Sequence, residues 1–206
     1  MTTPVSFLSS FIAPSSFEWQ MLANTQSFTS PLVGNTQTVE MAGARWFGKA
    51  TWEVLNNDQW RELEGWIARL AGAAGRFYFG PLHAATPRGI GTGTPLVAGA
   101  SQTGRTLVTD GWTASQTGIL KRGDYISFDS GTGRELKIVT ADANSDGLGQ
   151  ATLSIMPPIR YSPSDNATIT VNSPTGIMRL KDDGQGRNMV TPPVIGGMEI
   201  EFIEAF

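Results

Sequence analysis

The segment with the clearest metal-binding pattern runs from Asp142 to Gly147, DANSDG, and copies the opening of an EF-hand calcium loop. The twelfth position of such a loop should carry a bidentate Glu, and here it is Leu153. No helical pattern flanks the segment. We therefore interpret it as a hairpin loop rich in Asp, Asn and Gly, and we predict no metal site.

Other catalytic motifs are incomplete. His83 is the only histidine, so a Ser-His-Asp site or a His-ligated metal would depend on it alone, and no Gly-x-Ser-x-Gly elbow is present. The glycines from Gly89 to Gly93 lack phosphate-loop spacing and lead into no helix, which favours a connector. Asp182 and Asp183 lie in a polar segment where solvated turn caps are expected, whereas a glycosidase needs two carboxylates across a cleft. The sequence predicts neither an enzyme nor a cofactor.

Composition narrows the class of protein further. The 206 residues carry a net charge of -3, and only 16% of them are charged, which argues against a basic nucleic-acid footprint. There are no cysteines, so disulfides and thiolate sites are excluded. No apolar run approaches the roughly 18 residues of a membrane span, and no signal peptide is expected. The 24 glycines and 12 prolines fit a turn-rich β protein whose surface is partly covered by neighbours.

One stretch predicts a helix, over about residues 57–72. Asn56 and Gln59 have the spacing of a capping box at its start, and Gly72 and Gly75 supply the stop. Apolar residues recur through it every three or four positions, which indicates one buried stripe. Together with two tryptophans of the preceding strand, this stripe gives the predicted core: Trp46, Trp52, Trp60, Leu63, Trp66 and Leu70.

Alternating patterns predict the strands around this helix. Phe17, Trp19 and Met21 alternate with polar residues, and Val39 and Met41 follow on another alternating segment. We expect the Ser-, Thr- and Pro-rich residues 1–16 to be an amino-terminal extension that orders only against a neighbour. In the clearest strand one face carries Trp46, Gly48, Ala50, Trp52 and Val54, and the other face carries Phe47 among polar residues.

The middle of the chain changes character. Residues 82–99 are rich in Gly, Thr and Pro and are interpreted as a connector, and residues 97–172 contain five short strand candidates, which favours a small barrel. The candidates are 107–108, 125–128, 136–139, 151–155 and 168–171.

After residue 173 the longer strands return. Residues 177–180 predict one strand, 181–188 a polar turn, and 197–206 a closing strand with Met198, Ile200 and Phe202 inward. Its aromatic content matches the first 80 residues. We therefore predict a mainly β fold in which residues 1–96 and 173–206 form an outer domain and residues 97–172 are inserted into it.

Several segments resemble distal tail proteins of long-tailed, siphovirus-like bacteriophages. The tryptophan-bearing strand followed by the helix is one of them, and the others are SFTSPLVGNTQTVE at 27–40, RFYFGP at 76–81, PRG at 87–89, VAGASQTGRTL at 97–107, LKRGDYI at 120–126, ATLSIMPPIRYSP at 151–163 and MEIEFIEAF at 198–206. These segments span nearly the whole chain, and none is a catalytic signature.

The resemblance implies a β-sandwich collar domain with one α-helix and a small inserted β-barrel. It also implies a virion structural protein that forms a homohexameric ring at the tail tip or baseplate. Its expected partners are further copies of itself, the tail tube protein, the tip or baseplate hub protein and the tape measure protein. DNA would pass through the ring without specific binding. The protein would not insert into a membrane, and it would assemble in the host cytoplasm.

Two other classes of function are compatible with parts of the sequence. A carbohydrate-binding β-sandwich for host-surface recognition would use exposed aromatics, and its candidate platforms are Phe47, Trp112, Tyr125 and Tyr161. A hydrolase would have to rely on His83 without a nucleophile motif.

The closing strand carries three acidic residues, Glu199, Glu201 and Glu204, and no basic residue follows Arg187. A channel wall that DNA slides along should not hold phosphate, because clustered Lys and Arg would bind each passing segment. We therefore hypothesise that these three glutamates face the lumen of the ring.

Overall fold

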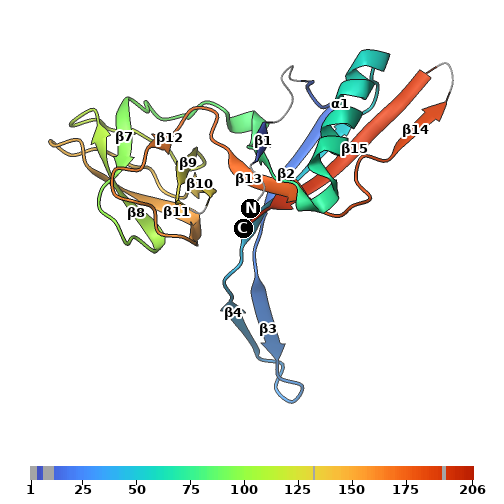
Figure 1. The fold of residues 1–206 in the computed structure, drawn as a ribbon. Helices are drawn as coiled ribbons and strands as arrows, with labels where there is room; N and C mark the ends of the chain where they lie inside the picture. Colours follow the sequence, from blue (N-terminus) through green and yellow to red (C-terminus); the bar gives the residue numbers. More distant parts are fainter. Residues whose placement is uncertain (1–3, 7–11, 132, 192–193) are drawn as a thin grey trace.

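The computed structural model describes residues 4–6, 12–131, 133–191 and 194–206. The protein is mainly β, with one α-helix among these residues, α1 (Asn57–Leu70), and two short 3-10 helices, η1 (Gly72–Ala74) and η2 (Leu82–Ala84). The strands form two large sheets, and a two-stranded hairpin projects away from both of them (Figure 1).

The first large sheet, here called the collar sheet, is built from both ends of the chain. Its strand order is β1-β6-β13-β15-β5-β2, and β14 pairs with β15 off this path. Within it β1 and β6 are parallel, and the other pairs are antiparallel. The strands are β1 (Val5–Ser6), β2 (Ser16–Leu22), β5 (Arg45–Trp52), β6 (Phe77–Phe79), β13 (Gly176–Leu180), β14 (Asn188–Thr191) and β15 (Val194–Glu204).

One face of the collar sheet is apolar because the side chains of its strands alternate. Along β5 the buried residues are Trp46, Gly48, Ala50 and Trp52, as predicted. Val54 does not continue this face, because the strand ends at Trp52 and the chain bends away, leaving Val54 72% exposed.

Helix α1 covers the apolar face of the collar sheet. It starts with the predicted capping box, in which Asn56 accepts the Gln59 N–H and Gln59 accepts the Asn56 N–H. It ends at Leu70, before the predicted Gly72, because Ala71 adopts the left-handed conformation with φ 51°. Of the predicted core residues, Trp46, Trp52, Leu63, Trp66 and Leu70 are buried, whereas Trp60 is only half-buried at the edge of the same cluster.

The collar is therefore a single sheet packed against one helix, and the predicted pair of stacked sheets is not observed. The sheet is strongly curved, because Phe17 at the start of β2 lies 5.7 Å from Phe79 of β6, between ring centroids, although four strand pairings separate these strands. Gly48 permits part of this packing, since a Cβ there would lie 2.4 Å from the ring of Phe202.

The second large sheet, here called the barrel sheet, has the order β12-β9-β10-β11-β8-β7. A backbone bridge between Leu96 and Thr168 brings its two edges together, so the sheet is nearly closed. It has its own apolar core. The strands are β7 (Gly93–Val97), β8 (Gly104–Trp112), β9 (Tyr125–Asp129), β10 (Arg134–Val139), β11 (Ala151–Ile159) and β12 (Ile169–Thr170).

All five predicted strands of this middle unit are present, and a sixth, β7, was missed. Its residues were assigned to the connector because GTPLV begins with Gly, Thr and Pro. The unit therefore begins before residue 97.

The barrel packs on the collar through β9 and β10, which are buried on both faces. Ile126 and Phe128 point into the barrel core, whereas Tyr125, Leu136 and Ile138 join the collar core. The Trp46 indole N–H donates to the Leu136 carbonyl at 2.9 Å across this junction.

The amino-terminal segment is not a free extension in the part that the structure describes. Val5 and Ser6 pair with Phe77 and Tyr78 of the same chain, and Ile12 is buried in the collar core. Residues 1–3 and 7–11 of the predicted amino-terminal extension lie outside the described residues. The α-helix that the structure describes is neither long nor apolar enough to cross a membrane.

Candidate functional site

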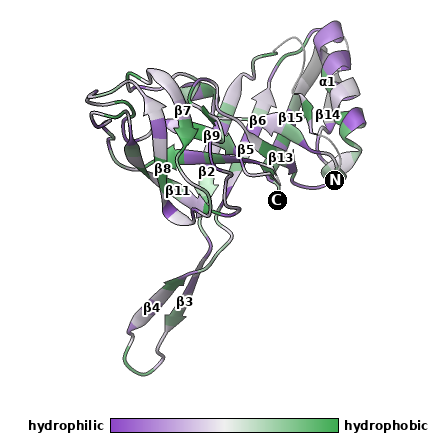
Figure 2. Ribbon diagram, turned by 60° about the vertical axis from the view of Figure 1, so that its left-hand side comes forward, coloured by the Kyte–Doolittle hydropathy of each residue, from purple (hydrophilic) through white to green (hydrophobic). Residues whose placement is uncertain are grey.

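The most exposed feature of the described structure is the hairpin of β3 (Thr25–Thr29) and β4 (Thr36–Glu40), here called the arm. All residues of both strands are exposed, and Figure 2 shows the arm extending beyond both sheets. At its turn Leu32 is 94% exposed and Val33 74% exposed. An isolated two-stranded hairpin is at best marginally stable in water, so this geometry points to contacts outside the chain.

The base of the arm is fixed to both large sheets. β2 leads directly into β3, and β4 leads into β5, so the arm continues an antiparallel pair of the collar sheet. Arg105 of β8 forms an ion pair with Glu40 at the end of β4. The arm is thus held at its base and free at its turn.

The arm was not predicted from the sequence. Its strands show no apolar-polar alternation, and Ser30-Pro31 and Gly34-Asn35 indicated only a loop. The available signal was the pair Leu32-Val33, two large apolar residues between turn residues in a segment with no charge from Thr25 to Val39.

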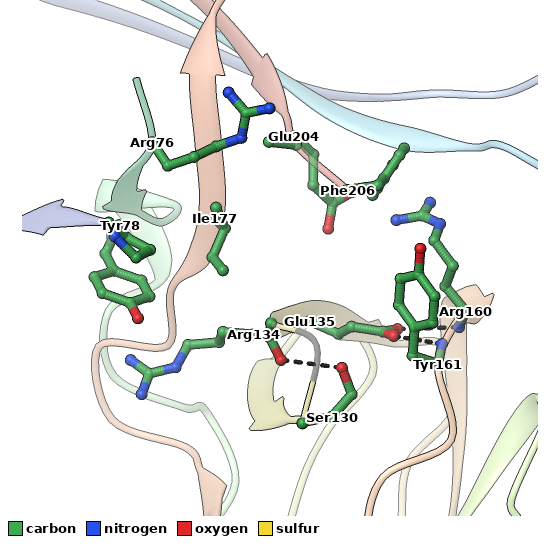
Figure 3. A pocket seen from close by; sticks show the side chains of 14 residues that line it. Arg76, Tyr78, Ser130, Arg134, Glu135, Arg160, Tyr161, Ile177, Glu204 and Phe206 are labelled. Atoms are coloured by element: carbon green, nitrogen blue, oxygen red, sulfur yellow. Dashed lines mark hydrogen bonds between the residues drawn. The ribbon is translucent and has the colours of Figure 1, made fainter. Parts of the chain in front are cut away.

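A cavity of about 410 Å³ lies at the junction of collar and barrel (Figure 3). Glu204 of β15 faces it and is buried, accepting the Trp46 main-chain N–H at 3.2 Å. Burial raises the pKa of Glu204 to about 7, against the opposing attraction of Arg160 and Lys137. Such a carboxyl is only partly ionised at neutral pH.

A buried ion pair lies beside this carboxyl. Lys137 and Glu135, both on β10, are joined at 2.6 Å, and burial lowers the pKa of Lys137. Glu135 also accepts the main-chain N–H groups of Arg160 and Tyr161, as Figure 3 shows. Its carboxylate thus anchors the end of β11 to β10.

The arginines that line the junction cavity are already engaged. Arg160 donates to the Ala44 carbonyl at 2.7 Å and lies over the ring of Phe206. Arg134 pairs with Asp129, and Arg76 donates to the carbonyl oxygens of residues 73–75. The cavity is therefore best explained as the joint between the two units.

The three glutamates predicted to face a lumen do not share one surface. Glu199 is exposed and Glu201 half-buried on the outer face of the collar sheet, but Glu204 lies on the opposite, core-facing side. The prediction is therefore wrong for Glu204. The error follows from strand periodicity, because residues 199 and 201 are in phase with 203, not with 204.

Two lysines, one on β5 and one directly after β13, lie beside the two outer glutamates. Lys49 of β5 pairs with Glu199 at 2.9 Å, and Lys181 pairs with Glu201 at 2.6 Å. The hydrogen bond that Lys49 donates to Glu199 raises the pKa of Lys49. This face is therefore close to charge balance, which the closing strand alone did not reveal.

The polar side chains of the calcium-loop-like segment 142–147 form hydrogen bonds with the backbone of nearby loops. Asp142, Asn144 and Asp146 accept main-chain N–H groups of the loops near residues 118, 122 and 148. Within the described residues no group of three or more His, Cys, Asp or Glu could hold a metal ion.

The glycine-rich residues 89–93 and the pair Asp182-Asp183 also make contacts that hold the backbone in place. The N–H groups of Ile90 and Gly91 donate to barrel carbonyls, and a Cβ on Gly89 would lie 2.4 Å from the Ile119 oxygen. Asp183 accepts the Ala73 N–H, and Asp182 accepts the Gly184 N–H within its own turn. His83 is exposed in η2, edge-on to Tyr125.

The aromatic residues proposed as sugar platforms do not form one. Trp112 and Tyr125 are buried, one in each core, and Phe47 is half-buried beside Lys181. Of these four aromatics, Tyr161 alone is exposed.

No protein-family model matches the chain, and a comparison with curated proteins finds no match.

Proposed function

We propose that this protein is a structural component of a bacteriophage tail that assembles into a ring at the distal end of the tail, between the tail tube and the tip or baseplate hub. The observation that supports assembly is the arm, whose apolar turn has no contact within the described chain that would bury it. The identity of the assembly comes from the resemblance described above, not from the arm.

In this proposal the collar forms the ring wall and the barrel lies outside it. The ring is six-fold, and its neighbours are the tail tube protein, the hub protein and the tape measure protein. The chain is not an enzyme and needs no cofactor. The assembly site is the host cytoplasm, and the final location is the virion tail tip.

The outer collar face carrying Glu199 and Glu201 is a candidate for the channel wall. Lys49 and Lys181 on this face are each paired with one of these glutamates, so neither is a free cation for phosphate. DNA could then slide past it with little attraction, as passage through a tail requires.

Imaging of the purified protein, alone and with tail tube protein, tests the proposal. We expect closed rings of uniform diameter, seen by negative-stain microscopy, and a matching mass in solution. A protein that stays monomeric inside assembled tails would refute it. Specific glycan binding by the monomer, without rings, would instead favour the carbohydrate-binding alternative.

A further inference from the structure

The collar carries a second surface feature, an uncharged hollow of about 740 Å³. It is formed by three separate segments, at residues 13–17, 80–85 and 173–175. Leu82 is exposed at its rim, and Pro81 and Pro174 are buried in its wall. Asp, Glu, Lys and Arg are all missing from its thirteen described lining residues: Ala13, Pro14, Ser15, Ser16, Phe17, Gly80, Pro81, Leu82, His83, Ala85, Ser173, Pro174 and Thr175.

The turn of the arm has matching chemistry. Residues 30–35, here called the tip, contain Leu32 and Val33, which are among the most exposed large apolar side chains of the described chain. The arm carries no charge from Thr25 to Val39. A tip without charge can enter an uncharged hollow without leaving a buried ion unpaired, which would be costly.

A chain cannot place its tip in its own hollow. The hollow includes Ser16 and Phe17, at the start of β2, whereas the arm leaves from the other end of that strand, after Leu22. Figure 1 shows the arm pointing away from both sheets. Sixteen residues of extended chain from Ser16 to Leu32 cover on the order of 40–50 Å. Any contact between the two features must therefore join two copies.

We propose that the tip of one copy, through Leu32 and Val33, seats in the hollow of a second copy. The volume of the hollow is in the range that holds a group of several side chains. Because tip and hollow are different surfaces of the same chain, the contact is head-to-tail, and such contacts close into rings when the rotation between copies permits. This inference rests on the proposed ring and names the surfaces that form it.

The absence of cysteine from the chain allows a direct test. Leu32→Cys and Leu82→Cys are prepared as separate full-length variants, one with a size tag, mixed under assembly conditions and treated with a short bis-maleimide. The matched control is Leu148→Cys, because Leu148 is 82% exposed in the loop between β10 and β11 of the barrel and belongs to neither the tip nor the lining of the hollow. We expect the pair of residues 32 and 82 to cross-link at least ten times more than either pairing with residue 148.

A charge exchange provides the second measurement. Leu32→Asp should abolish rings, because it carries a charge into the hollow, and combining it with Leu82→Lys should restore them. Circular dichroism should be unchanged, since both sites are exposed.

The outcomes separate this inference from the proposed function. Rings that form without preferential cross-linking of 32 to 82, or that tolerate Leu32→Asp, would overturn the tip-in-hollow contact while the ring itself stands. Failure of the wild-type protein to form rings with tail tube protein, together with absent cross-linking, would overturn both.

Discussion

Two hairpins of this protein share the same strand geometry and occupy opposite environments. The β9–β10 hairpin is buried on both faces, between the barrel core and the collar core, whereas every residue of β3 and β4 is exposed. The first is stabilised entirely within its chain. The second is exposed along both strands and at its turn, and in the proposed ring its further contacts come from a neighbouring copy. Substitutions in and around the two hairpins test this difference.

The largest loss of stability should come from Trp46→Ala. Trp46 stacks on Trp19 at 5.4 Å between ring centroids, packs against Tyr125 of β9 and donates to Leu136 of β10. Truncating a buried aromatic of this kind costs about 3–5 kcal/mol. Urea unfolding followed by circular dichroism measures it. Trp60→Ala, at the half-buried edge of the core, is the control and should cost clearly less.

Asp124→Ala should have the next largest effect. This buried carboxylate, directly before β9, accepts the main-chain N–H groups of Arg88, Gly89 and Lys121 at 2.7–3.0 Å. Its removal leaves donors of the connector unsatisfied, at a cost of about 2–3 kcal/mol. Limited proteolysis near residues 85–92 should accelerate. Asp142→Ala, which removes one exposed contact, should change proteolysis little, and equal effects would contradict this account.

Glu204→Gln should produce a pH-dependent gain. The pKa of Glu204 is about 7 in the folded protein and 4.5 for an ordinary carboxyl, so the folded state loses stability as pH rises from about 4.5 to 7. Glutamine resembles the neutral acid and avoids this loss. The variant should match wild type near pH 4.5 and exceed it at pH 8 by roughly 1–3 kcal/mol.

Thermal melts across this pH range measure the effect. The groups facing Glu204 are Arg160, Lys137 and Glu135, and their influence is included in its pKa. Glu199→Gln, on the outer face of the same strand, serves as the control for the loss of a carboxylate from β15. A constant difference between Glu204→Gln and wild type at all pH values would show that Glu204 ionises normally.

The smallest effect on stability should come from the arm. Leu32→Ser with Val33→Ser removes apolar surface that is already in water, so unfolding of the monomer should shift by less than about 0.5 kcal/mol. Ring formation, counted on micrographs, should nevertheless be lost. A large destabilisation of the monomer would mean that the tip contacts its own chain.

The sequence was sufficient for elements whose signal is local. The capping box at Asn56 and Gln59 and the alternation along β5 depend on neighbours within a few residues, and both predictions are confirmed. The strand β7 was missed because Gly93 and Pro95 are poor strand residues, and its pairing with β8 compensates for them.

The candidate site was harder to predict because its properties are set by distant segments. Burial of Tyr125 depends on collar residues such as Trp46, and charge balance around Glu199 depends on Lys49, far away in the chain. The hollow joins three segments that no spacing rule connects. For the arm, Leu32 and Val33 were the local signal, but no alternation in residues 25–40 shows that both strands stand away from the two sheets.

The position of β15 determines when the collar can form during folding. It is the last strand of the chain, yet it pairs with β13, β5 and β14 at the middle of the collar sheet. Its contacts with β5, which lies far earlier in the chain, form slowly because a long loop must close first. The barrel is complete by Thr170, so it can fold on the ribosome while the collar waits. A chain interrupted before its last ten residues would lack most of β15 and would present a folded barrel without a complete collar sheet.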